Sequence, residues 1–556
     1  MRTVIIGGVA GGASAAARLR RLREQDEIII LERGEHISFA NCGLPYFIGG
    51  EIKDRSMLTL QTPQSFRARF NIDVRVRNEA VAIEPDNNIV IVRELDNNRE
   101  YKLSYDKLIL SPGAEPIKPP IEGVDLPHVF TLRNIPDTLK IRSYIEAERP
   151  KKAVVVGGGY IGAEMAENLV NTGLDVSIVE LADHLIASID ADMASDVHNY
   201  LREKGIGLYL GSGVTKITEK EVFLNNGSIP ADMVIISAGV RPETSLAKDC
   251  GINTDQRGNI IVNKQMQTNF SDIYAVGDAV QVTDLVTGEP SFIPLAGPAN
   301  KQGRIAADNI AGFPSEYKGT QGSSIIKLFD MTVATTGINE KRAKAAGIDF
   351  DKTYTYSASH ASYYPGAKNM SVKILWEKGS LRLIGAQIVG FDGVDKRMDV
   401  LAAAVRFGAK VTDLTEMELC YAPPFGSAKD PVNMAGFVAE NIITGKMKQF
   451  FWHDVEALPR DGSVTLLDVR TKKETARGMI EGFINIPLDE LRDQLDKIPE
   501  HRPVYIHCHS GLRSYIACRI LEGHGYSCYN LAGGWRLYES VIHDRSVPPY
   551  ICTECK

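Results

Sequence analysis

The chain has 556 residues, more than the roughly 250 to 300 at which a single hydrophobic core stops growing, so we expect several domains. With 44% hydrophobic residues, 24% charged residues and a net charge of -7, it is a globular protein with no compositional reason to bind nucleic acid. Its apolar runs fall short of the roughly 18 residues of a membrane span, and the N-terminus shows no charged-then-apolar leader. We therefore predict a cytoplasmic protein, in which eight scattered cysteines favour reactive thiols over a disulfide framework.

The first predicted strand, "RTVIIGG", leads through a small-residue turn and a helical pattern to a second strand, "IIILERG". This order is a βαβ unit of the kind that binds dinucleotides. Gly7, Gly11 and Gly12 form the turn, although Val9 stands at the middle position of a strict GxGxxG. Glu32 ends the second strand, where a carboxylate accepts hydrogen bonds from ribose hydroxyls. The turn would place a pyrophosphate on the amides of a helix N-terminus.

A second βαβ unit begins at "KKAVVVGGGYIG", about 150 residues after the first. Gly157, Gly159 and Gly162 match GxGxxG strictly, and Glu180 ends the following strand. The next residues are Leu, Ala, Asp and His rather than arginines that would hold a 2′-phosphate. We therefore predict that NADH is preferred, with NADPH as the alternative.

A third element, "TNFSDIYAVGDAV", brings Asp278 to the carboxyl end of a strand. The nearby "PLAGPANKQGRIAADNI" starts a helix whose N-terminal dipole could stabilise negative charge on a reduced flavin. Together with the two glycine turns, this order resembles the flavoprotein disulfide reductase family. The resemblance implies that the first half binds FAD and the second binds NAD(P)H.

The resemblance assigns residues to both cofactors. The residues implied for FAD are Gly7, Ala10, Gly11, Gly12, Glu32, Arg33, Asn41, Val81, Ser111, Gly113, Arg133, Asp278, Pro294, Leu295 and Ala296. Those implied for NAD(P)H are Gly157, Gly159, Tyr160, Ile161, Gly162, Glu180 and Gly239.

"SFANCGLPYF" holds one cysteine, Cys42, where many members of the family carry a CxxxxC pair. Phe47 takes the place of the second cysteine, so an internal dithiol is excluded. The stretch resembles the single-cysteine branch of NADH peroxidases, NADH oxidases and coenzyme A disulfide reductases. A single thiolate beside a flavin must cycle through a sulfenic acid or through a mixed disulfide or persulfide with its substrate.

Two features favour sulfur chemistry over oxygen chemistry. The resemblance to peroxidases and oxidases would require a histidine in the first glycine turn, where this chain has Ala10. "YYPGAK" and "CYAPPFGSAKDPVN" resemble the segments that carry two active-site tyrosines of coenzyme A disulfide reductases, which implies catalytic roles for Tyr363 and Tyr421. These would reach Cys42 from the partner subunit of a homodimer. Tyr364 is the neighbouring alternative, and packing at a dimer interface is the other interpretation.

The predicted helix "ASAAARLRRLREQ" places Arg18 and Arg21 three residues apart on one face, suited to the phosphates of coenzyme A. Solvation of that face is the alternative. Weaker candidates to line the coenzyme A site are Ser38, Asn41, Phe66 and Arg69.

"HCHSGLRS" near the C-terminus places Cys508 before a five-residue loop and a helix. The loop residues are His509, Ser510, Gly511, Leu512 and Arg513, and their amides would hold an anionic persulfide. With "LLDVRTKKE", "GFINIPL" and "LAGGWRLY" in order, the segment resembles a single rhodanese domain. A phosphatase loop would close with arginine at position 514, which is serine here; a buried structural cysteine is the other alternative.

Cys552 and Cys555 form a CxxC at the extreme C-terminus. An inert tail, a mobile thiol pair and half of a zinc site all remain open, and we predict no metal site.

The predicted fold class is α/β, with two Rossmann-like domains, an α+β dimerisation domain and a C-terminal rhodanese domain. The predicted boundaries are 1–115 and 250–321 for FAD, 116–249 for NAD(P)H, 322–445 for dimerisation, 446–454 for a linker, 455–550 for rhodanese and 551–556 for the tail. The whole chain resembles fusions of a coenzyme A disulfide reductase with a rhodanese. This implies NAD(P)H-dependent reduction of coenzyme A persulfide, polysulfide or coenzyme A disulfide at Cys42, with Cys508 handling sulfane sulfur. An NADH oxidase or peroxidase, and a sulfur-relay or redox-sensing protein, are the alternatives.

Overall fold

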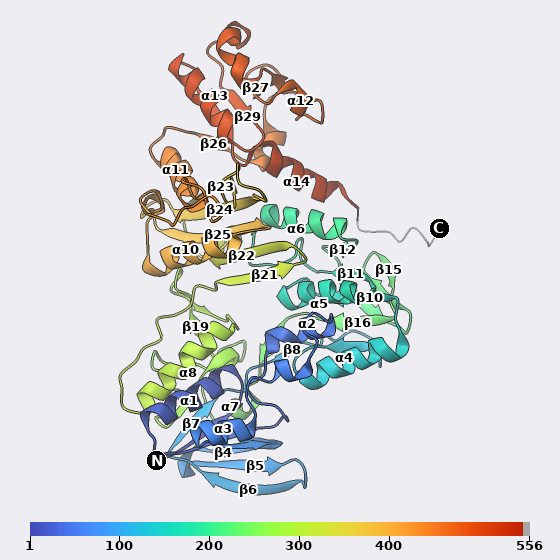
Figure 1. Cartoon of the computed structure of the whole chain (residues 1–556), viewed down its shortest axis with the longest axis vertical. Coiled ribbons are helices and arrows are strands. Elements are labelled where there is room, and N and C mark those ends of the chain that lie inside the picture. Colours follow the sequence, from blue (N-terminus) through green and yellow to red (C-terminus); the bar gives the residue numbers. More distant parts are fainter. Residues whose placement is uncertain (549–556) are drawn as a thin grey trace. The chain divides into compact units, whose positions relative to one another are not determined.

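The computed structural model describes residues 1–548, so the predicted pair Cys552 and Cys555 lies outside the described residues. The chain divides into two compact units, whose helices and strands are labelled in Figure 1. The first unit holds residues 1–181 and 209–322, and the second holds residues 182–208 and the chain from Ser323 onward. No helix within residues 1–548 is long and apolar enough to cross a membrane.

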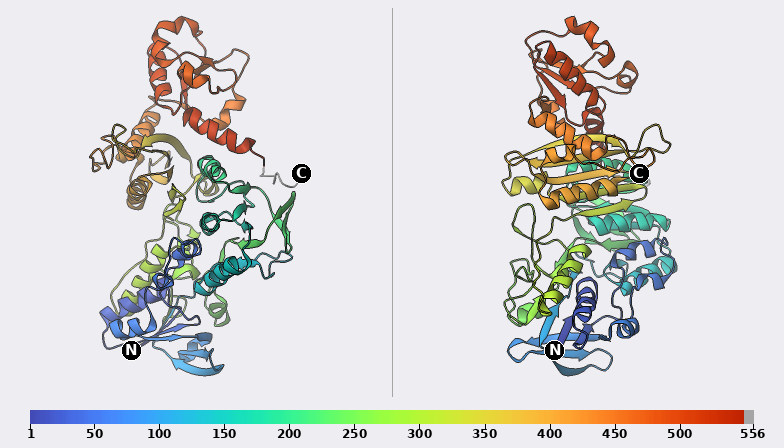
Figure 2. Two further views of the ribbon diagram at one scale, coloured as in Figure 1. Left: turned by 45° about the vertical axis from the view of Figure 1, so that its right-hand side comes forward. Right: turned by 60° about the vertical axis from the view of Figure 1, so that its left-hand side comes forward.

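A parallel sheet with the strand order β18-β7-β1-β2-β3 opens the first unit. Its central strands are continuous apolar runs because both faces are buried; Val4, Ile5, Ile29 and Ile30 are each 0% exposed. Helices α1 and α8 lie side by side (Figures 1 and 2). These elements are β1 (Arg2–Ile6), α1 (Ala10–Leu22), β2 (Glu27–Glu32), β3 (Asp73–Val76), β7 (Lys107–Leu110), β18 (Ile273–Ala275) and α8 (Ala296–Ile310).

An antiparallel sheet, β4-β5-β6, and several short elements complete this part of the unit. The 3-10 helix η1 runs directly into α2, and Cys42 lies in η1. The bounds are η1 (Asn41–Gly43), α2 (Leu44–Ile48), η2 (Arg55–Leu58), α3 (Pro63–Phe70), β4 (Asn78–Glu84), η3 (Pro85–Asn87), β5 (Ile89–Glu94), β6 (Arg99–Ser104), α7 (Ser245–Asp249), η4 (Gly277–Ala279), β19 (Val282–Thr283) and β20 (Pro290–Ser291).

The second predicted nucleotide half contains the parallel strands β11-β10-β16-β9 and a small antiparallel meander. Each half therefore follows its glycine turn with a helix and a returning parallel strand, as predicted. The bounds are β9 (Val129–Thr131), α4 (Ile135–Glu148), β10 (Lys152–Val156), α5 (Tyr160–Asn171), β11 (Asp175–Val179), β12 (Gly207–Tyr209), β13 (Val214–Ile217), β14 (Glu221–Leu224), β15 (Gly227–Pro230) and β16 (Met233–Ile236).

The chain enters and leaves this second half through two paired strands. β8 (Ala114–Pro116) follows "LILSPG", and β17 (Val240–Pro242) follows "MVIISAG". The two strands are antiparallel, with Pro116 opposite Val240. The two crossings thus pair with each other through backbone hydrogen bonds.

The second unit is built around an antiparallel sheet with the order β21-β22-β25-β24-β23. Helix α10 packs on β22 and β25, and α11 packs on β23. The bounds are α6 (Ala191–Glu203), β21 (Ser324–Leu328), β22 (Met331–Gly337), α9 (Glu340–Ala345), β23 (Phe350–Ala358), β24 (Asn369–Glu377), β25 (Leu383–Gly390), α10 (Val394–Phe407), η5 (Val411–Thr415) and α11 (Pro431–Ile443).

The last part of this unit is a parallel sheet with the order β26-β30-β29-β27-β28. Its apolar core includes the Cys508 side chain. These sheets confirm the predicted fold class. The bounds are β26 (Gln449–Phe450), η6 (Trp452–Ala457), β27 (Thr465–Asp468), α12 (Lys472–Thr475), β28 (Ile484–Asn485), η7 (Leu488–Lys497), β29 (Val504–His507), α13 (Leu512–Gly523), β30 (Cys528–Leu531) and α14 (Gly534–Ser546).

Candidate functional site

The first glycine turn is shaped by close backbone contacts. Gly7 has φ +94°, and a Cβ there would lie 2.1 Å from Ser111 O. A Cβ at Gly12 would lie 1.9 Å from Gly7 O, so both positions require glycine. Glu32 accepts hydrogen bonds from the Gly8 amide at 3.0 Å and the Gly34 amide at 2.8 Å, which fixes its carboxylate at the end of β2.

The second glycine turn repeats this geometry. Gly157 has φ +107° and its Cβ would lie 2.3 Å from Ser237 O, while a Cβ at Gly162 would lie 1.9 Å from Gly157 O. Glu180 accepts from the Gly158 amide at 2.6 Å. Open space surrounds Gly159 where a side chain would begin, and it precedes α5, whose first residues are Tyr160 and Ile161. The turn therefore leaves room for a phosphate at the start of the helix.

Several predicted FAD residues converge around Arg133. A Cβ at Gly113 would lie 2.6 Å from Arg133 Nη2. When the Asn41 side-chain amide is turned so that both its nitrogen and its oxygen form hydrogen bonds, the oxygen accepts one from Arg133 Nη1 at 3.2 Å. Burial raises the pKa of Asp278, and the Arg133 charge lowers it. The cluster therefore gathers Asn41, Gly113 and Asp278 around one cation.

The other predicted FAD residues lie on separate elements of the same unit. Arg33 makes a bidentate ion pair with Glu243, in which Arg33 Nη2 donates to Oε2 at 2.7 Å. Val81 lies on β4, and Gly239 of the NAD(P)H set has φ +100° just before β17. Pro294 and Leu295 precede α8, which begins at Ala296.

These residues fit two bound dinucleotides, because each turn combines required glycines, a helix start and a strand-end acid. A buried Ser237 Oγ has no hydrogen-bond partner among residues 1–548 and lies next to the second turn. Glu32 and Asp278 would hold FAD, and Glu180 would hold the nicotinamide nucleotide. FAD supplies two-electron transfer between a hydride donor and a thiol or disulfide when bound.

Cys42 is an exposed free thiol in η1, directly before α2. Protein nevertheless surrounds its sulfur closely enough that burial raises the pKa of the thiol, and the Glu164 and Asp278 carboxylates raise it further. The residues of this chain around Cys42 therefore favour the neutral thiol. A positive charge or dipole placed beside the sulfur would lower that pKa again.

Glu164 is the acid that most strongly affects Cys42 electrostatically. It follows the second glycine turn on α5 and accepts a hydrogen bond from Tyr46 Oη at 3.2 Å. Burial raises the pKa of Glu164 to about 7, against the lowering effect of the Tyr46 bond. Its charge therefore changes within the physiological range.

The predicted coenzyme A residues have unequal surroundings. Arg18 Nε is paired with Asp308 Oδ1 at 2.7 Å, so its charge is largely compensated, whereas Arg21 and Arg69 are exposed. Phe66 is 3% exposed and packs in the core, which leaves little surface for a ligand. Ser38 is half-buried, with φ +45°, and its amide donates to Gly8 O at 2.8 Å.

Tyr363 and Tyr421 are brought together in the second unit. Their hydroxyl oxygens lie 2.9 Å apart in a hydrogen bond, although the residues are 58 positions apart in the chain. They are 74% and 49% exposed. The hydrogen bond to Tyr421 raises the pKa of Tyr363. Tyr364 instead packs edge-on against His360, with ring centroids 5.6 Å apart.

Cys508 is housed differently, because it directly follows β29 and is fully buried. Its Sγ accepts from the Gly511 amide at 3.1 Å and from Ser514 Oγ at 3.2 Å. Gly511 has φ +102° and caps α13, so the positive helix end faces the sulfur. The amides of Trp535 and Arg536 donate to Cys508 O and His509 O, which fixes the base of the loop.

The loop arginine, Arg513, turns toward α12. It donates to Glu474 Oε2 at 2.8 Å and Oε1 at 2.6 Å. These bonds hold the pKa of Glu474 well below its usual range. Leu512, the preceding loop residue, is 58% exposed.

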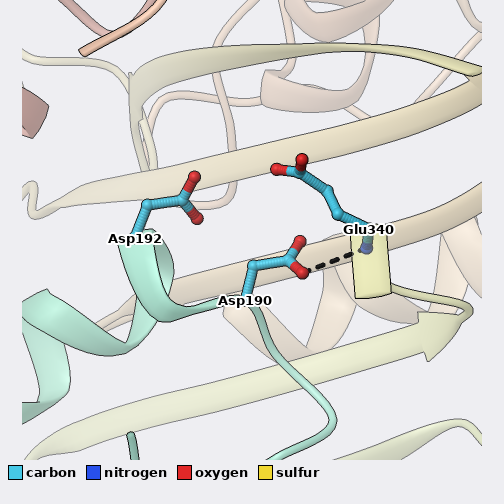
Figure 3. A group of neighbouring side chains, drawn as sticks. All are labelled: Asp190, Asp192 and Glu340. Atoms are coloured by element: carbon cyan, nitrogen blue, oxygen red, sulfur yellow. Dashed lines mark hydrogen bonds between the residues drawn. The ribbon is translucent and has the colours of Figure 1, made fainter. Parts of the chain in front are cut away.

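An acidic cluster in the second unit resembles a metal site but holds an ammonium group. The carboxylates of Asp190, Asp192 and Glu340 point toward one another (Figure 3). Lys373 Nζ lies 2.8 Å from Asp190 Oδ2, 2.8 Å from Asp192 Oδ1 and 2.6 Å from Glu340 Oε1. Lys352 Nζ also lies 2.6 Å from Glu340 Oε1, so two lysine charges face three carboxylates in a buried ion-pair network.

Sequence reasoning missed the groups that adjoin the two thiols. Glu164 stands two residues after Gly162, and its position beside a glycine turn was the available signal. Thr471 and Glu474 form a T-x-x-E capping box that marks the start of α12. The pairing of Glu474 with Arg513 joins residues 39 positions apart and left no sequence pattern.

Comparisons with known families cover most of the chain. A family model described as pyridine nucleotide-disulphide oxidoreductase matches residues 1–303. The dimerisation domain of that family matches residues 323–431, and a rhodanese-like domain matches residues 452–540.

Curated relatives carry two different names at equal similarity. Coenzyme A disulfide reductase of Staphylococcus aureus is 36% identical over 441 residues, which are 79% of this chain and 100% of the relative. NADH oxidase of Methanocaldococcus jannaschii is 36% identical over 451 residues, which are 80% of this chain and 100% of the relative.

Two solved structures match nearly the whole chain. Reduced Bacillus anthracis CoADR-RHD has a TM-score of 0.96 and 48% identity, covering 98% of both chains. An NAD-dependent persulfide reductase from A. fulgidus has a TM-score of 0.91 and 37% identity, covering 97% of this chain and 100% of that one.

Proposed function

Because the chain belongs to the pyridine nucleotide-disulphide oxidoreductase family, we propose that it is an NAD(P)H-dependent flavoprotein acting on sulfur substrates. Its substrates are coenzyme A persulfide, polysulfide or coenzyme A disulfide, reduced at Cys42. Cys508 carries sulfane sulfur in the fused rhodanese domain. The observation that carries this proposal is that one chain holds both an exposed thiol, Cys42, and a caged thiol, Cys508.

The first step at Cys42 is thiol–disulfide exchange. The Cys42 thiolate attacks the carbon-bound sulfur of a coenzyme A persulfide, forming a Cys42–coenzyme A disulfide and releasing hydrosulfide. With coenzyme A disulfide the same attack releases coenzyme A thiolate. Two electrons and a proton then return the mixed disulfide to the Cys42 thiolate and free coenzyme A.

Tyr363 and Tyr421 protonate or orient the leaving thiolate. Their direct hydrogen bond makes one hydroxyl the donor and leaves the second able to donate outward. We infer a homodimer in which this pair reaches the Cys42 of the partner subunit, a reading supported by the dimerisation-domain match. The exposed Arg21 and Arg69 are the better candidates for coenzyme A phosphates than the compensated Arg18.

An NADH oxidase is the second candidate, and the 36% identity to the M. jannaschii protein favours it. In that case, Cys42 would cycle through a sulfenic acid and oxygen would accept the electrons. Ala10 in the first glycine turn argues against an oxidase, because it stands where a histidine would assist cleavage of an oxygen bond.

The deciding experiment compares NADH oxidation and sulfide release with coenzyme A persulfide, coenzyme A disulfide, polysulfide and oxygen. We expect Cys42→Ser to lose turnover with every sulfur acceptor, and Cys508→Ser to keep turnover with coenzyme A disulfide. Tyr363→Phe/Tyr421→Phe should lose most of the sulfur activity. Oxygen-dependent NADH oxidation that survives the double tyrosine variant would establish the oxidase instead.

We propose that the domains follow the boundaries predicted from the sequence, with a linker at residues 446–454 that contains β26 and overlaps the first residues of the rhodanese match. A reducing, cytoplasmic setting is consistent with free thiols at all six cysteines among residues 1–548. Limited proteolysis at residues 446–454 tests the linker.

A further inference from the structure

A cavity of about 120 Å³ borders the loop that follows Cys508. Ser510, Gly511 and Leu512 line it, together with residues of strand β23 and helix α11. No charged side chain lines it within the described part of the chain. Gly511 connects the cavity to the sulfur, because its amide donates to Cys508 Sγ.

Three residues that line this cavity each carry a buried side-chain oxygen with no hydrogen-bond partner among residues 1–548: Thr355 Oγ1, Gln449 Oε1 and Asn530 Oδ1. Thr355 is 7% exposed and Asn530 is 4% exposed. The amide nitrogens are already engaged, since Asn530 Nδ2 donates to Gly511 O at 3.1 Å and Gln449 Nε2 donates to Lys352 O at 2.7 Å. The two amide oxygens are therefore fixed as acceptors, and they require N–H or O–H donors.

The positive charge of Arg513, the arginine of the loop, does not offset the preference of these oxygens for hydrogen-bond donors. Both terminal nitrogens of the Arg513 guanidinium donate to Glu474, in a bidentate pair that compensates its charge. Arg470, which precedes α12, is likewise bidentate with Asp468 and fully buried. The loop amides and the start of α13 would hold the anionic sulfur of either donor class, but the outer oxygens of an oxyanion would face acceptor oxygens in the cavity, with Arg513 and Arg470 already paired to carboxylates.

Building on the proposed sulfur chemistry, we propose that this cavity and the Arg513–Glu474 pair select the sulfur donor of Cys508. The donor is the persulfide of an organic thiol whose flanking group carries an amide N–H or a hydroxyl. Sulfur oxyanions such as thiosulfate, which can only accept hydrogen bonds, are discriminated against. Glu474 acts as a specificity residue by holding Arg513 away from the donor.

The sulfur transfer is the same for both donor classes. The Cys508 thiolate attacks the terminal sulfur of RSS⁻, forms the Cys508 persulfide anion and releases RS⁻. With thiosulfate, the released group is sulfite. Cyanide then removes the terminal sulfur as thiocyanate and regenerates the thiolate, so electrons and charges balance.

The test measures thiocyanate formation by the FAD-loaded full chain carrying Cys42→Ser, so that only Cys508 transfers sulfur. The donors are thiosulfate, the persulfide of N-acetylcysteamine, and the persulfide of 2-mercaptoethyl acetate, in which an ester oxygen replaces the amide N–H. We expect kcat/KM for the amide donor to be about tenfold higher than for the ester donor, and about a hundredfold or more higher than for thiosulfate. Thr355→Val should lower kcat/KM for the amide donor several-fold and change kcat/KM for the ester donor much less.

Glu474→Gln tests the ion pair separately. Glutamine can still accept a hydrogen bond from Thr471 in the capping box, but it cannot compensate the charge of Arg513. We therefore expect kcat/KM for thiosulfate to rise about tenfold. Glu474→Gln/Arg513→Gln should abolish that rise. Glu522→Gln removes a surface ion pair with Arg519 on α13 and is the matched control. We expect it to leave kcat/KM unchanged for both donors.

Equal use of thiosulfate and the amide donor by the parent chain would overturn the proposal, as would an unchanged donor ratio in Glu474→Gln. Neither result bears on Cys42, because the assay contains no NADH. Conversely, loss of NADH-dependent activity would refute the proposed function and leave this donor preference standing.

Discussion

The thiols of Cys42 and Cys508 differ in exposure, in the element that carries them and in their hydrogen bonds. Cys42 is exposed, lies in a short 3-10 helix, and has carboxylates nearby that oppose its ionisation. Cys508 is fully buried, follows a β-strand directly, and accepts two hydrogen bonds on its sulfur. The first is built to be reached by another molecule, and the second to hold a negative sulfur in place. A reductive thiol and a sulfur carrier need these opposite arrangements.

The contrast in accessibility gives the largest expected effect. Iodoacetamide should alkylate Cys42 at least about a hundredfold faster than Cys508, because a fully buried sulfur reacts only when the structure opens locally. Peptide-level mass spectrometry separates the two from the exposed Cys420. Comparable rates would show that the Cys508 loop opens readily, which would remove the basis of the comparison.

Ser514→Ala probes the caged thiol. Loss of the Ser514 Oγ donor should slow sulfur uptake at Cys508 about five- to tenfold, since a hydrogen bond of this kind contributes about 1 to 1.5 kcal/mol. Stopped-flow or thiocyanate assays measure the uptake, with NADH oxidation by coenzyme A disulfide as the internal control. An effect on both activities would point to misfolding rather than to the lost hydrogen bond.

Glu164→Gln probes the exposed thiol and should give the smallest effect. The Glu164 carboxylate raises the pKa of Cys42, so its neutralisation should lower that pKa and speed alkylation about threefold. The difference should appear above pH 7, where Glu164 is ionised, and vanish below its pKa of about 7, where wild-type Glu164 is already neutral. Glu164→Asp, which keeps the charge, is the control. A ratio that does not change with pH would exclude the Glu164 charge as the cause.

The sequence was sufficient to predict the fold class, because glycine turns and strand-end acids leave local patterns. The turn at Gly157 and the acid Glu180 have the predicted relation, joined through the Gly158 amide. The loop around Cys508 could be predicted equally well, because the cysteine, the loop and the start of the following helix all lie within one short segment.

Properties that depend on distant contacts could not be predicted. Arg18 and Phe66 stood out by residue type, yet Arg18 pairs with Asp308, 290 positions away, and Phe66 lies in the core. The pKa of Cys42 depends on burial and on Glu164, and only the folded chain supplies either. The tyrosine pair is an intermediate case, since the resemblance named both residues but only the structure shows their hydrogen bond.

The pairing of β8 with β17 has a consequence for how such a chain could arise or be rebuilt. Pro116 and Val240 are opposite partners, and neighbouring strands lie about 5 Å apart, so the two ends of the intervening segment nearly meet. A segment whose ends nearly meet can be exchanged through one short junction. Such an exchange of the nicotinamide half would still have to keep Glu164, which affects the pKa of Cys42, and Asp192, which pairs with Lys373, so a change of coenzyme preference is better made inside the segment than by replacing it.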